Sequence, residues 1–349
     1  MKHRYPAATI EATARSLLEA AGLPNSRAAV VASTLKEAEL LGRSTHGLWL
    51  LDFYLADLAN GTMAKIAEPV VLSDHGSAVV WDGNLLPGAW LIHEAMDDAF
   101  RRLDTHPVVT ITIKRSHHVG CHAVYLRHAT ERDVMMLLMD TNPGFKIVAP
   151  FGSTQALYSP TPLSVGIPTN EHPILIDFSL SSSSLGRASL QHRRGERLAG
   201  KWLMDHSGKP TDDPSVLFAD PPGSILPLGG ADLGYKGFSL ALMVYALSAG
   251  LTGYTSRGMA DGNESAVFLQ LIDPEKFGGR DALRRTMSSF VEMCRRCSVA
   301  PGTPGVRIPG ENAEQKRAEA LENGVDLSAE CVEMLTRWAR TLGAPRPLN

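Results

Sequence analysis

Residues 108–139, with the sequence VVTITIKRSHHVGCHAVYLRHATERDVMMLLM, contain two kinds of hydrophobic pattern. The continuous apolar runs at 108–113 and 134–139 are typical of buried strands. The segment between them, 122–131, is a candidate helix. A strand, a helix and a second strand in succession predict an α/β fold, with the polar residues 114–120 at the end of the first strand.

The chain on either side of this stretch extends the pattern. Apolar spacing and runs predict helices at 10–22, 25–42, 48–58, 89–103 and 238–250, and strands at 70–72, 78–81, 163–167, 174–178 and 267–272. From residue 283 the pattern is helical again, with one interruption at the turn sequence PGTPG. We therefore expect an N-terminal helical segment (1–70), a mixed α/β region (71–280) and a C-terminal helical segment (281–349) that packs with the first.

The composition excludes several classes of protein. Apolar residues make up 44% of the 349 residues and charged residues 20%, so the chain can bury a large core. The net charge of −3, from 34 basic and 37 acidic side chains, provides no basic face for nucleic acid or an anionic membrane. The longest apolar stretch, 238–251, is too short to span a bilayer, and no leader pattern opens the chain. We expect a cytoplasmic protein without nucleic-acid or membrane partners.

The segment STHG at 44–47 lies in the break between two predicted helices. Histidine is the side chain whose ordinary pKa lies nearest neutrality, so His46 is a candidate proton donor or acceptor. Thr45 could orient the imidazole or a substrate oxygen. The alternative is that this segment only caps or packs a helix junction.

A second polar cluster, KRSHHVG at 114–120, follows the first of the predicted strands directly. Folds of the α/β class place their sites at such strand ends. His118 and His122 would share a helix face if the helix began at Gly120, which permits a metal site beside Cys121. We expect no metal, because no third ligand has a characteristic spacing and no His-Glu-x-x-His motif is present.

The glycine-rich segment PLGGADLGYKG at 227–237 opens the predicted apolar helix at 238–250. Glycines before a helix N-terminus, together with Lys236, suit a phosphate or pyrophosphate, although a helix cap explains them equally well. The segment is not a P-loop, since Tyr235 stands where that motif has lysine. No Gly-x-Gly-x-x-Gly sequence follows a strand, so the usual dinucleotide-binding fingerprint is absent.

Hydroxyl side chains follow the predicted strand at 174–178. The segment DFSLSSSSLG at 177–186 could line a ribose or a phosphate, and the alternative is a flexible polar loop. Cys294 and Cys297 have the spacing of a metal or redox pair. No second pair exists, and their place within a helical pattern favours coincidence.

Taken in order, these segments resemble the type-2 malate/L-lactate dehydrogenase family, which includes ureidoglycolate and sulfolactate dehydrogenases, diketogulonate reductase and cyclic-imine reductases. The resemblance covers nearly the whole chain and rests on collinear motifs. They are STHG at 44–47, SHHVG at 116–120, TN at 141–142 with VAPFG at 148–152, DFS at 177–179, WLMD at 202–205 with GKPT at 208–211, PLGG at 227–230, YKG at 235–237 and RIPGE at 307–311.

The resemblance implies a nicotinamide-dependent oxidoreductase on the family's own α/β fold, which is unrelated to the Rossmann fold. It also implies NAD or NADP bound on a mixed sheet within region 71–280, a small-molecule substrate and a homodimer. By position, His46 matches the family's acid/base histidine, with Thr45 beside it, and His118 matches a second active-site histidine. The positions that match cofactor-binding residues are Ser116, Thr141, Asp177, Phe178, Ser179, Leu180, Ser181, Tyr235, Lys236, Gly310 and Glu311.

Three departures from the family pattern concern the substrate. Ser44 stands where relatives have aspartate, Leu50 stands where they commonly have a carboxylate-binding arginine, and SPTP at 159–162 replaces Gly-Thr-Asn-Pro. Losing a guanidinium–carboxylate pair removes a contact of roughly 1.5–3 kcal/mol. Either Arg43 or Arg115 replaces that arginine, or the substrate is not the usual small 2-hydroxy acid. The expected substrate contacts are Leu50, Arg43, Pro160 and Thr161.

The sequence thus predicts reversible oxidation of a 2-hydroxy acid, with the cofactor taking the hydride and His46 the proton. His118 would hydrogen-bond the reacting oxygen or exchange roles with His46, and Lys236 would meet the cofactor's phosphates or ribose. Three alternatives stay open: reduction of a C=N bond in a cyclic imino acid, a dinucleotide-binding paralogue without turnover, and a metal-dependent hydrolase that uses His118 and His122.

Overall fold

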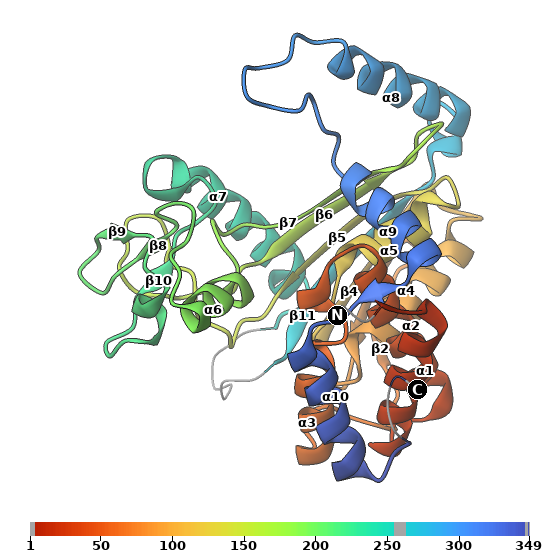
Figure 1. The fold of residues 1–349 in the computed structure, drawn as a ribbon. Helices are drawn as coiled ribbons and strands as arrows, with labels where there is room; N and C mark the ends of the chain where they lie inside the picture. Colours follow the sequence, from red (N-terminus) through yellow and green to blue (C-terminus); the bar gives the residue numbers. More distant parts are fainter. Residues whose placement is uncertain (1–3, 255–262, 346–347, 349) are drawn as a thin grey trace.

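A mixed β-sheet, seven strands wide in the part of the chain that is described, forms the centre of the molecule (Figure 1). The computed structural model describes residues 4–254, 263–345 and 348. Along the sheet the strand order is β2 (Val70–Asp74), β3 (Ala78–Asp82), β4 (Val108–Ser116), β11 (Ser265–Ile272), β5 (Met135–Thr141), β6 (Pro162–Ile167) and β7 (Ile174–Ser179). Neighbouring strands are antiparallel except β3 and β4, which run parallel. The predicted mixed α/β class is confirmed.

Strand β11 lies in the middle of the sheet, between β4 and β5, and is buried on both faces. Val267 and Leu269 pack into one hydrophobic core, whereas Phe268 between them packs into a second. A strand that is buried on both faces shows a continuous apolar run instead of alternation. This is why the sequence at 267–272 predicts a strand without a period of two.

Two helices cover one face of the sheet. Helix α4 (Gly88–Arg102) packs against β4 and β11, and α5 (His122–Thr130) packs against β5, β6 and β7. Both contribute to the core that contains Val267, α4 through Leu91 and Ile92 and α5 through Tyr125 and Leu126. The predicted helices at 89–103 and 122–131 are therefore confirmed.

The two ends of the chain share this larger core (Figure 1). It takes in α1 (Ala7–Ala20), α2 (Asn25–Leu40), α3 (Leu50–Asn60) and, from the other end, α10 (Ala329–Leu342). The short strands β1 (Arg4–Tyr5) and β12 (Val325–Asp326) pair antiparallel, and α9 (Glu311–Asn323) lies against α2.

Polar contacts reinforce the packing of α10 on α3. The Asp52 carboxylate on α3 accepts hydrogen bonds from the Trp338 indole and the Arg337 guanidinium on α10, each at 2.6 Å. The predicted packing of the helical chain ends is thus confirmed. The division of the chain at residues 70 and 280 stays a prediction.

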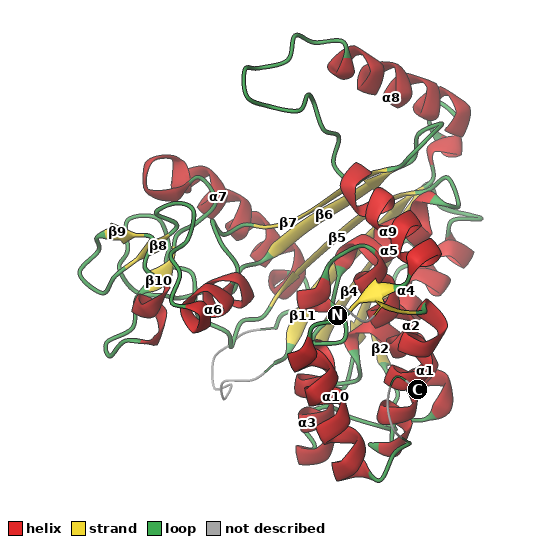
Figure 2. Ribbon diagram, in the orientation of Figure 1, coloured by secondary structure: helices red, strands yellow, loops and turns green. Residues whose placement is uncertain are grey.

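A smaller lobe lies beside the sheet (Figure 2). It contains β8 (Leu203–Met204), β9 (Pro210–Thr211), β10 (Ser224–Ile225), α6 (Leu185–Arg194), α7 (Gly230–Tyr245), the 3-10 turn η2 (Pro214–Phe218) and the π turn η3 (Ala246–Gly250). Its core joins Leu203, Ile225 and Val244 to Met139 and Phe268 of the central sheet. The lobe is therefore anchored on the sheet face opposite α4 and α5.

Helix α7 begins at Gly230 and not at residue 238, which corrects the sequence prediction. Three glycines in the segment 230–237 lower its helix propensity, so the pattern there looks like a loop. Packing overrides the propensity, because a Cβ at Gly237 would lie 2.4 Å from the Leu228 carbonyl oxygen and only glycine permits this approach. Tyr235 and Lys236 consequently lie on the helix and not in a loop before it.

The hydroxyl-rich segment 177–186 is only partly a loop. Strand β7 extends to Ser179, and α6 begins at Leu185, where the Ser184 hydroxyl caps the helix by accepting a hydrogen bond from the Arg187 backbone N–H at 3.2 Å. A serine at the N-cap position is a strong helix-start signal that the run of hydroxyls conceals.

Helix α8 (Arg280–Arg295) follows the 3-10 turn η4 (Pro274–Lys276), and the loop after it extends outward in Figure 1 before it returns to β7, where the Leu175 backbone N–H donates to the Pro309 carbonyl at 3.0 Å. Cys294 lies on α8 and Cys297 just after it, both as free thiols. None of the helices in the described ranges has the length and apolar character needed to cross a membrane.

Candidate active site

His46 lies in η1 (Ser44–His46), a 3-10 turn that joins α2 to α3. Gly42, with a φ of +70°, ends α2, so the chain turns and presents the His46 side chain at the boundary of the core, half-buried. The Thr45 hydroxyl lies 3.0 Å from His46 Nδ1, which fixes the ring and leaves Nε2 for a substrate. The predicted break between two helices and the pairing of Thr45 with His46 are both present.

The buried carboxyl group of Glu39 packs against this turn. Glu39 on α2 accepts a hydrogen bond from the Leu48 backbone N–H at 2.7 Å. A Cβ at Gly47 would lie 2.3 Å from Glu39 Oε1, so the turn can pass over Glu39 only with glycine at that position. Burial raises the pKa of Glu39 to about 7, although the hydrogen bond from Leu48 opposes the shift.

His118 lies beside His46, in the loop that connects β4 to α5. The two imidazole rings are nearly parallel, with centroids 6.0 Å apart. The Tyr54 hydroxyl on α3 lies 3.0 Å from His118 Nδ1, and the Gly120 backbone N–H donates to the same nitrogen at 3.3 Å. Because Nδ1 accepts, the neutral ring carries its proton on Nε2. Burial, with His46 nearby, lowers the pKa of His118 to about 3.

The pKa of His46 is also lowered from its ordinary value. Burial is the main cause, and the charges of His122 and Arg43 act in the same direction. The carboxylates of Asp177 and Asp140 oppose the shift. Both histidines are thus neutral near pH 7; the Asp140 charge opposes the lowered pKa of each, and the Asp177 charge does so for His46.

Asp177 lies on β7, within a buried polar network. Its carboxylate accepts hydrogen bonds from the Ala123 backbone N–H at 3.1 Å and from the Ser164 hydroxyl at 3.0 Å. The same hydroxyl lies 2.9 Å from His122 Nδ1, and His122 Nε2 lies 3.0 Å from Asp140 Oδ1. The network therefore connects β5, β6 and β7 with α5 at the strand ends nearest His46.

Sequence reasoning missed four members of this site. Tyr54, Glu39, Asp140 and Ser164 all occur inside predicted helices or at predicted strand ends, where a single polar residue is common. Their partners lie 42 residues away in the case of Ser164 and His122, and 64 residues away for Tyr54 and His118. The only available signal was a carboxylate directly after the apolar run 134–139.

The other predicted cofactor positions divide into two groups. Phe178, with 40% of its side chain exposed, and Ser179 continue β7 from Asp177. Leu180 is fully buried in the core of the smaller lobe, and its backbone N–H donates to the Pro160 carbonyl at 2.9 Å. Ser181 is buried and donates to the Ser183 carbonyl at 2.8 Å.

The segments at 141 and 159–161 lie next to this strand end. Thr141 and Ser159 share a hydroxyl–hydroxyl hydrogen bond of 3.2 Å, and Ser116 donates to the His117 carbonyl at 2.8 Å. Thr161 is buried with a positive φ of +41°, just after Pro160. The structure thus brings the predicted positions from β4, β5, β6 and β7 to one edge of the sheet.

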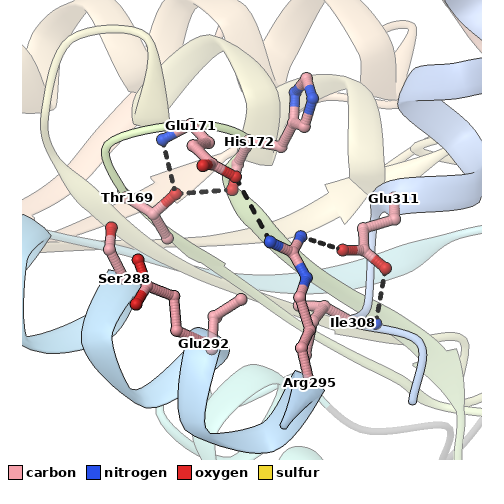
Figure 3. Close-up of a pocket in the computed structure, with 9 residues that line it drawn as sticks. Thr169, Glu171, His172, Ser288, Glu292, Arg295, Ile308 and Glu311 are labelled. Atoms are coloured by element: carbon pink, nitrogen blue, oxygen red, sulfur yellow. Dashed lines mark hydrogen bonds and ion pairs between the residues drawn. The ribbon is translucent and has the colours of Figure 1, made fainter. Parts of the chain in front are cut away.

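Tyr235, Lys236, Gly310 and Glu311 lie outside this group. On α7, Lys236 Nζ lies 5.9 Å from the centre of the Tyr235 ring, which is 47% exposed. Glu311 begins α9, where its carboxylate binds the Arg295 guanidinium and accepts the Ile308 backbone N–H at 2.9 Å (Figure 3). The cavity next to this ion pair has a volume of about 20 Å³, enough for a water molecule but not for a nucleotide.

Two of the candidate substrate residues, Arg43 and Leu50, flank the turn that carries His46. Leu50 begins α3 and is half-buried, and Arg43 is exposed one residue before η1. Arg115 is held elsewhere, because its guanidinium binds the Asp82 carboxylate at 2.8 Å and also contacts Asn84. No carboxylate in the described ranges forms an ion pair with Arg43.

No group of three or more histidine, cysteine or carboxylate side chains among the described residues has the arrangement of a metal site. His118 and His122 do not share a helix face, since α5 begins at His122. Burial raises the pKa of the Cys121 thiol to about 12.

Residues 5–336 match the family model described as malate/L-lactate dehydrogenase, and the chain belongs to that family. It is 30% identical to the (2R)-3-sulfolactate dehydrogenase (NADP(+)) of Chromohalobacter salexigens, over 94% of this chain and 96% of that protein. The predicted family and the prediction of an oxidoreductase acting on CH–OH groups are confirmed.

Solved structures show the same fold. The malate dehydrogenase of Entamoeba histolytica superposes with a TM-score of 0.93 at 22% identity, covering 99% of this chain and 100% of that one. The delta1-piperideine-2-carboxylate reductase of Pseudomonas syringae superposes with a TM-score of 0.83 at 24% identity, covering 97% and 100%. The predicted non-Rossmann fold is therefore confirmed.

Proposed function

We propose that this protein catalyses reversible hydride transfer between NAD or NADP and a 2-hydroxy acid, with His46 as the acid/base. The observation that carries the proposal is the pair of neutral histidines at the strand ends, in which Thr45 holds His46 at Nδ1 and the Asp177 and Asp140 charges favour the imidazolium form of His46. A neutral imidazole can take the hydroxyl proton when the substrate is oxidised and return it when the oxo acid is reduced.

The donor set at the sheet edge fits a nicotinamide dinucleotide. Such a cofactor supplies or accepts the hydride, and the protein must bind its ribose hydroxyls, its phosphates and a flat ring. Ser179 offers a hydroxyl, Phe178 an exposed ring, and Lys236 a cation that forms no ion pair with the described carboxylates. Glu311 fits less well, because its carboxylate already binds Arg295 and the Ile308 N–H.

His46 and His118 have different roles at the substrate: His46 transfers the proton, and His118 donates a hydrogen bond. Thr45 holds His46 by Nδ1, so Nε2 moves the proton. His118 is held by Tyr54 and Gly120 with its proton on Nε2, from which it donates a hydrogen bond to the reacting oxygen. This neutral donor stabilises the developing oxyanion without competing for the proton.

The substrate lies between Leu50 and the loop around Pro160 and Thr161. An apolar side chain at residue 50 cannot pair with a buried carboxylate, which would then cost several kcal/mol, on the order of 2–7, if left without a partner. Arg43 takes the substrate carboxylate, because Arg115 is held by Asp82 and Arg43 has no ion pair within the described chain.

The protein forms a homodimer through α7. Leu233, Leu242 and Met243 on this helix expose 49%, 56% and 39% of their surface. Apolar side chains gathered on one helix are typical of a protein interface. Sedimentation equilibrium of the wild type and of Leu242→Glu tests this part, with a dimer expected for the first and weaker association for the second.

An absorbance screen at the reduced-nicotinamide band tests the proposed function. NADH and NADPH are each combined with a panel of 2-oxo acids and cyclic imines. Oxidation of the cofactor with a 2-oxo acid is the expected result. Turnover with cyclic imines alone favours C=N reduction, and binding of cofactor without any turnover favours the paralogue that has lost activity.

A further inference from the structure

His122 is the first residue of α5 and lies buried at the edge of the sheet, with 3% of its surface exposed. Its two ring nitrogens face different partners. Nδ1 lies 2.9 Å from the Ser164 hydroxyl on β6, and Nε2 lies 3.0 Å from Asp140 Oδ1 on β5. A histidine with both nitrogens engaged in this way has no nitrogen left for a substrate or a metal.

The direction of the hydrogen bonds determines where the protons are. Ser164 has a single hydroxyl proton, and it donates this proton to Asp177 at 3.0 Å. Toward His122 the same oxygen can only accept, so Nδ1 carries a hydrogen. Nε2 lies at ion-pair distance, 3.0 Å, from a carboxylate oxygen of Asp140, and a bare nitrogen lone pair there would face that negative charge, so Nε2 carries a hydrogen as well. Both ring nitrogens are therefore protonated, and His122 is an imidazolium between two carboxylates.

The surroundings of His122 agree with this charge. Burial alone would lower the pKa of His122, but the hydrogen bond and charge of Asp140, with the charge of Asp177, raise it above the ordinary value. Ala38 on α2 and Leu41, just after that helix, form a hydrophobic cluster with Ala123 and Val124 at this end of α5. The titratable or charged groups around it are Asp140 on β5, Asp177 on β7, Cys121 before α5, His118 in the preceding loop, and His46 and Arg43 next to η1.

We infer that His122 is a positioning residue: a buried imidazolium, held by Asp140 and Ser164, that fixes the Asp177 carboxylate near His46. It touches neither substrate nor cofactor and acts through Ser164 and Asp177. Without this cation two carboxylates would share a buried edge of the sheet without charge compensation, which is strongly unfavourable. The inference rests on the proposed role of His46, but the charge on His122 can be measured without any turnover.

The experiment is a histidine NMR titration of the wild type and of His122→Asn. The protein is labelled with ¹⁵N in its 12 histidines, and the His122 signals are assigned by their loss in the variant. The asparagine amide keeps a donor toward Ser164 but has no charge. His93→Asn is the control, because His93 is a half-buried histidine on α4 whose ring contacts Thr34 and Tyr125 and not Asp177.

Both nitrogens of His122 should be protonated at neutral pH in the wild type. In His122→Asn the pKa of His46 should rise by about one unit, because the repelling cation is gone while Asp177 and Asp140 remain. The limb of the kcat/KM profile that reports His46 should move by the same amount. His93→Asn should leave both unchanged.

A His122 ring with a single proton at neutral pH would overturn the inference. So would a His122→Asn variant that loses activity by the same factor at every pH while the pKa of His46 stays constant. The wild-type spectrum decides the charge on His122 even where the variant does not fold. Absence of turnover in the wild type would contradict the proposed function and leave the NMR result to decide the role of His122.

Discussion

The imidazole rings of His46 and His118 lie 6.0 Å apart and within 19° of parallel, although 72 positions separate them in the chain. Their hydrogen bonds differ in kind. His46 is held by one hydroxyl, from Thr45, whereas Tyr54 and the Gly120 N–H both approach Nδ1 of His118. Two neutral rings, each held at Nδ1 but by different partners, can divide proton transfer and oxyanion binding between them.

Leu50→Arg should shift substrate preference toward small, doubly charged 2-oxo acids such as oxaloacetate. The new guanidinium would add a charge-assisted hydrogen bond to a substrate carboxylate, worth up to roughly 1.5–3 kcal/mol in kcat/KM. The measurement is a ranking of 2-oxo acids by kcat/KM for both proteins, with Leu50→Met as the control of similar volume. A wild type that already prefers oxaloacetate, with the ranking unchanged in the variant, would contradict the pocket assignment.

Glu39→Gln should remove a pH dependence of stability. The folded-state pKa of Glu39 is raised to about 7, so the stability that it contributes is complete below its unfolded pKa and is lost as pH rises through 7. The loss amounts to about 3 kcal/mol. Urea unfolding at pH 5 and pH 8 measures it. Glu39→Gln should flatten the difference between the two pH values.

Glu37→Gln, on the same helix, is the control for this experiment. Burial would raise the pKa of Glu37, but the hydrogen bond and charge of Arg317, with Lys36, lower it. Its contribution to stability is therefore lost as pH falls and not as it rises. If Glu39→Gln and the wild type lose the same stability between pH 5 and pH 8, Glu39 does not hold its proton as the structure indicates.

Gly88→Ala should destabilise the protein and displace His118. A Cβ at residue 88 would lie 2.3 Å from the His117 carbonyl oxygen and 2.6 Å from that of His118, so the backbone that carries these two residues must move. Overpacking of this kind costs about 1–3 kcal/mol. Gly278→Ala is the control, since a Cβ there meets nothing within 4 Å. Thermal unfolding and kcat of both variants provide the test, and equal behaviour of the two would contradict the assigned position of His118.

Activity should persist in excess chelator. The proposed mechanism moves the proton at a histidine and the hydride at a nicotinamide, so it requires no metal. Metal analysis of the purified protein and assays with EDTA check this. Zinc near one equivalent per chain, lost together with activity, would favour the hydrolase alternative.

Local patterns in the sequence predicted the sheet strands and the positions of His46 and His118. The apolar run 108–113 predicts β4, and the polar residues directly after it include His118. The start of α7 was wrong, because the packing of Gly237 on Leu228 is a tertiary contact that no propensity encodes. Helix α6 was not predicted, because its capping serine, Ser184, stands in a run of identical residues.

The chemistry of the site was less accessible to sequence reasoning than the fold. Two contacts that define the site join residues far apart in the chain: His122 with Ser164, and Tyr54 with His118. His122 was singled out for its spacing from His118, which suggested a shared helix face. The structure gives it a different environment, since His118 lies before the helix and His122 begins it.

The most direct test of the account is the comparison of His46→Ala with the wild type, measuring kcat and the Kd of the reduced cofactor in parallel. Removing a general acid/base should lower kcat by about 10² to 10⁴. The Kd of the cofactor, from fluorescence titration of the reduced nicotinamide, should change by no more than a few fold. Loss of cofactor binding, with turnover intact in the complex that still forms, would contradict the role of His46 in proton transfer.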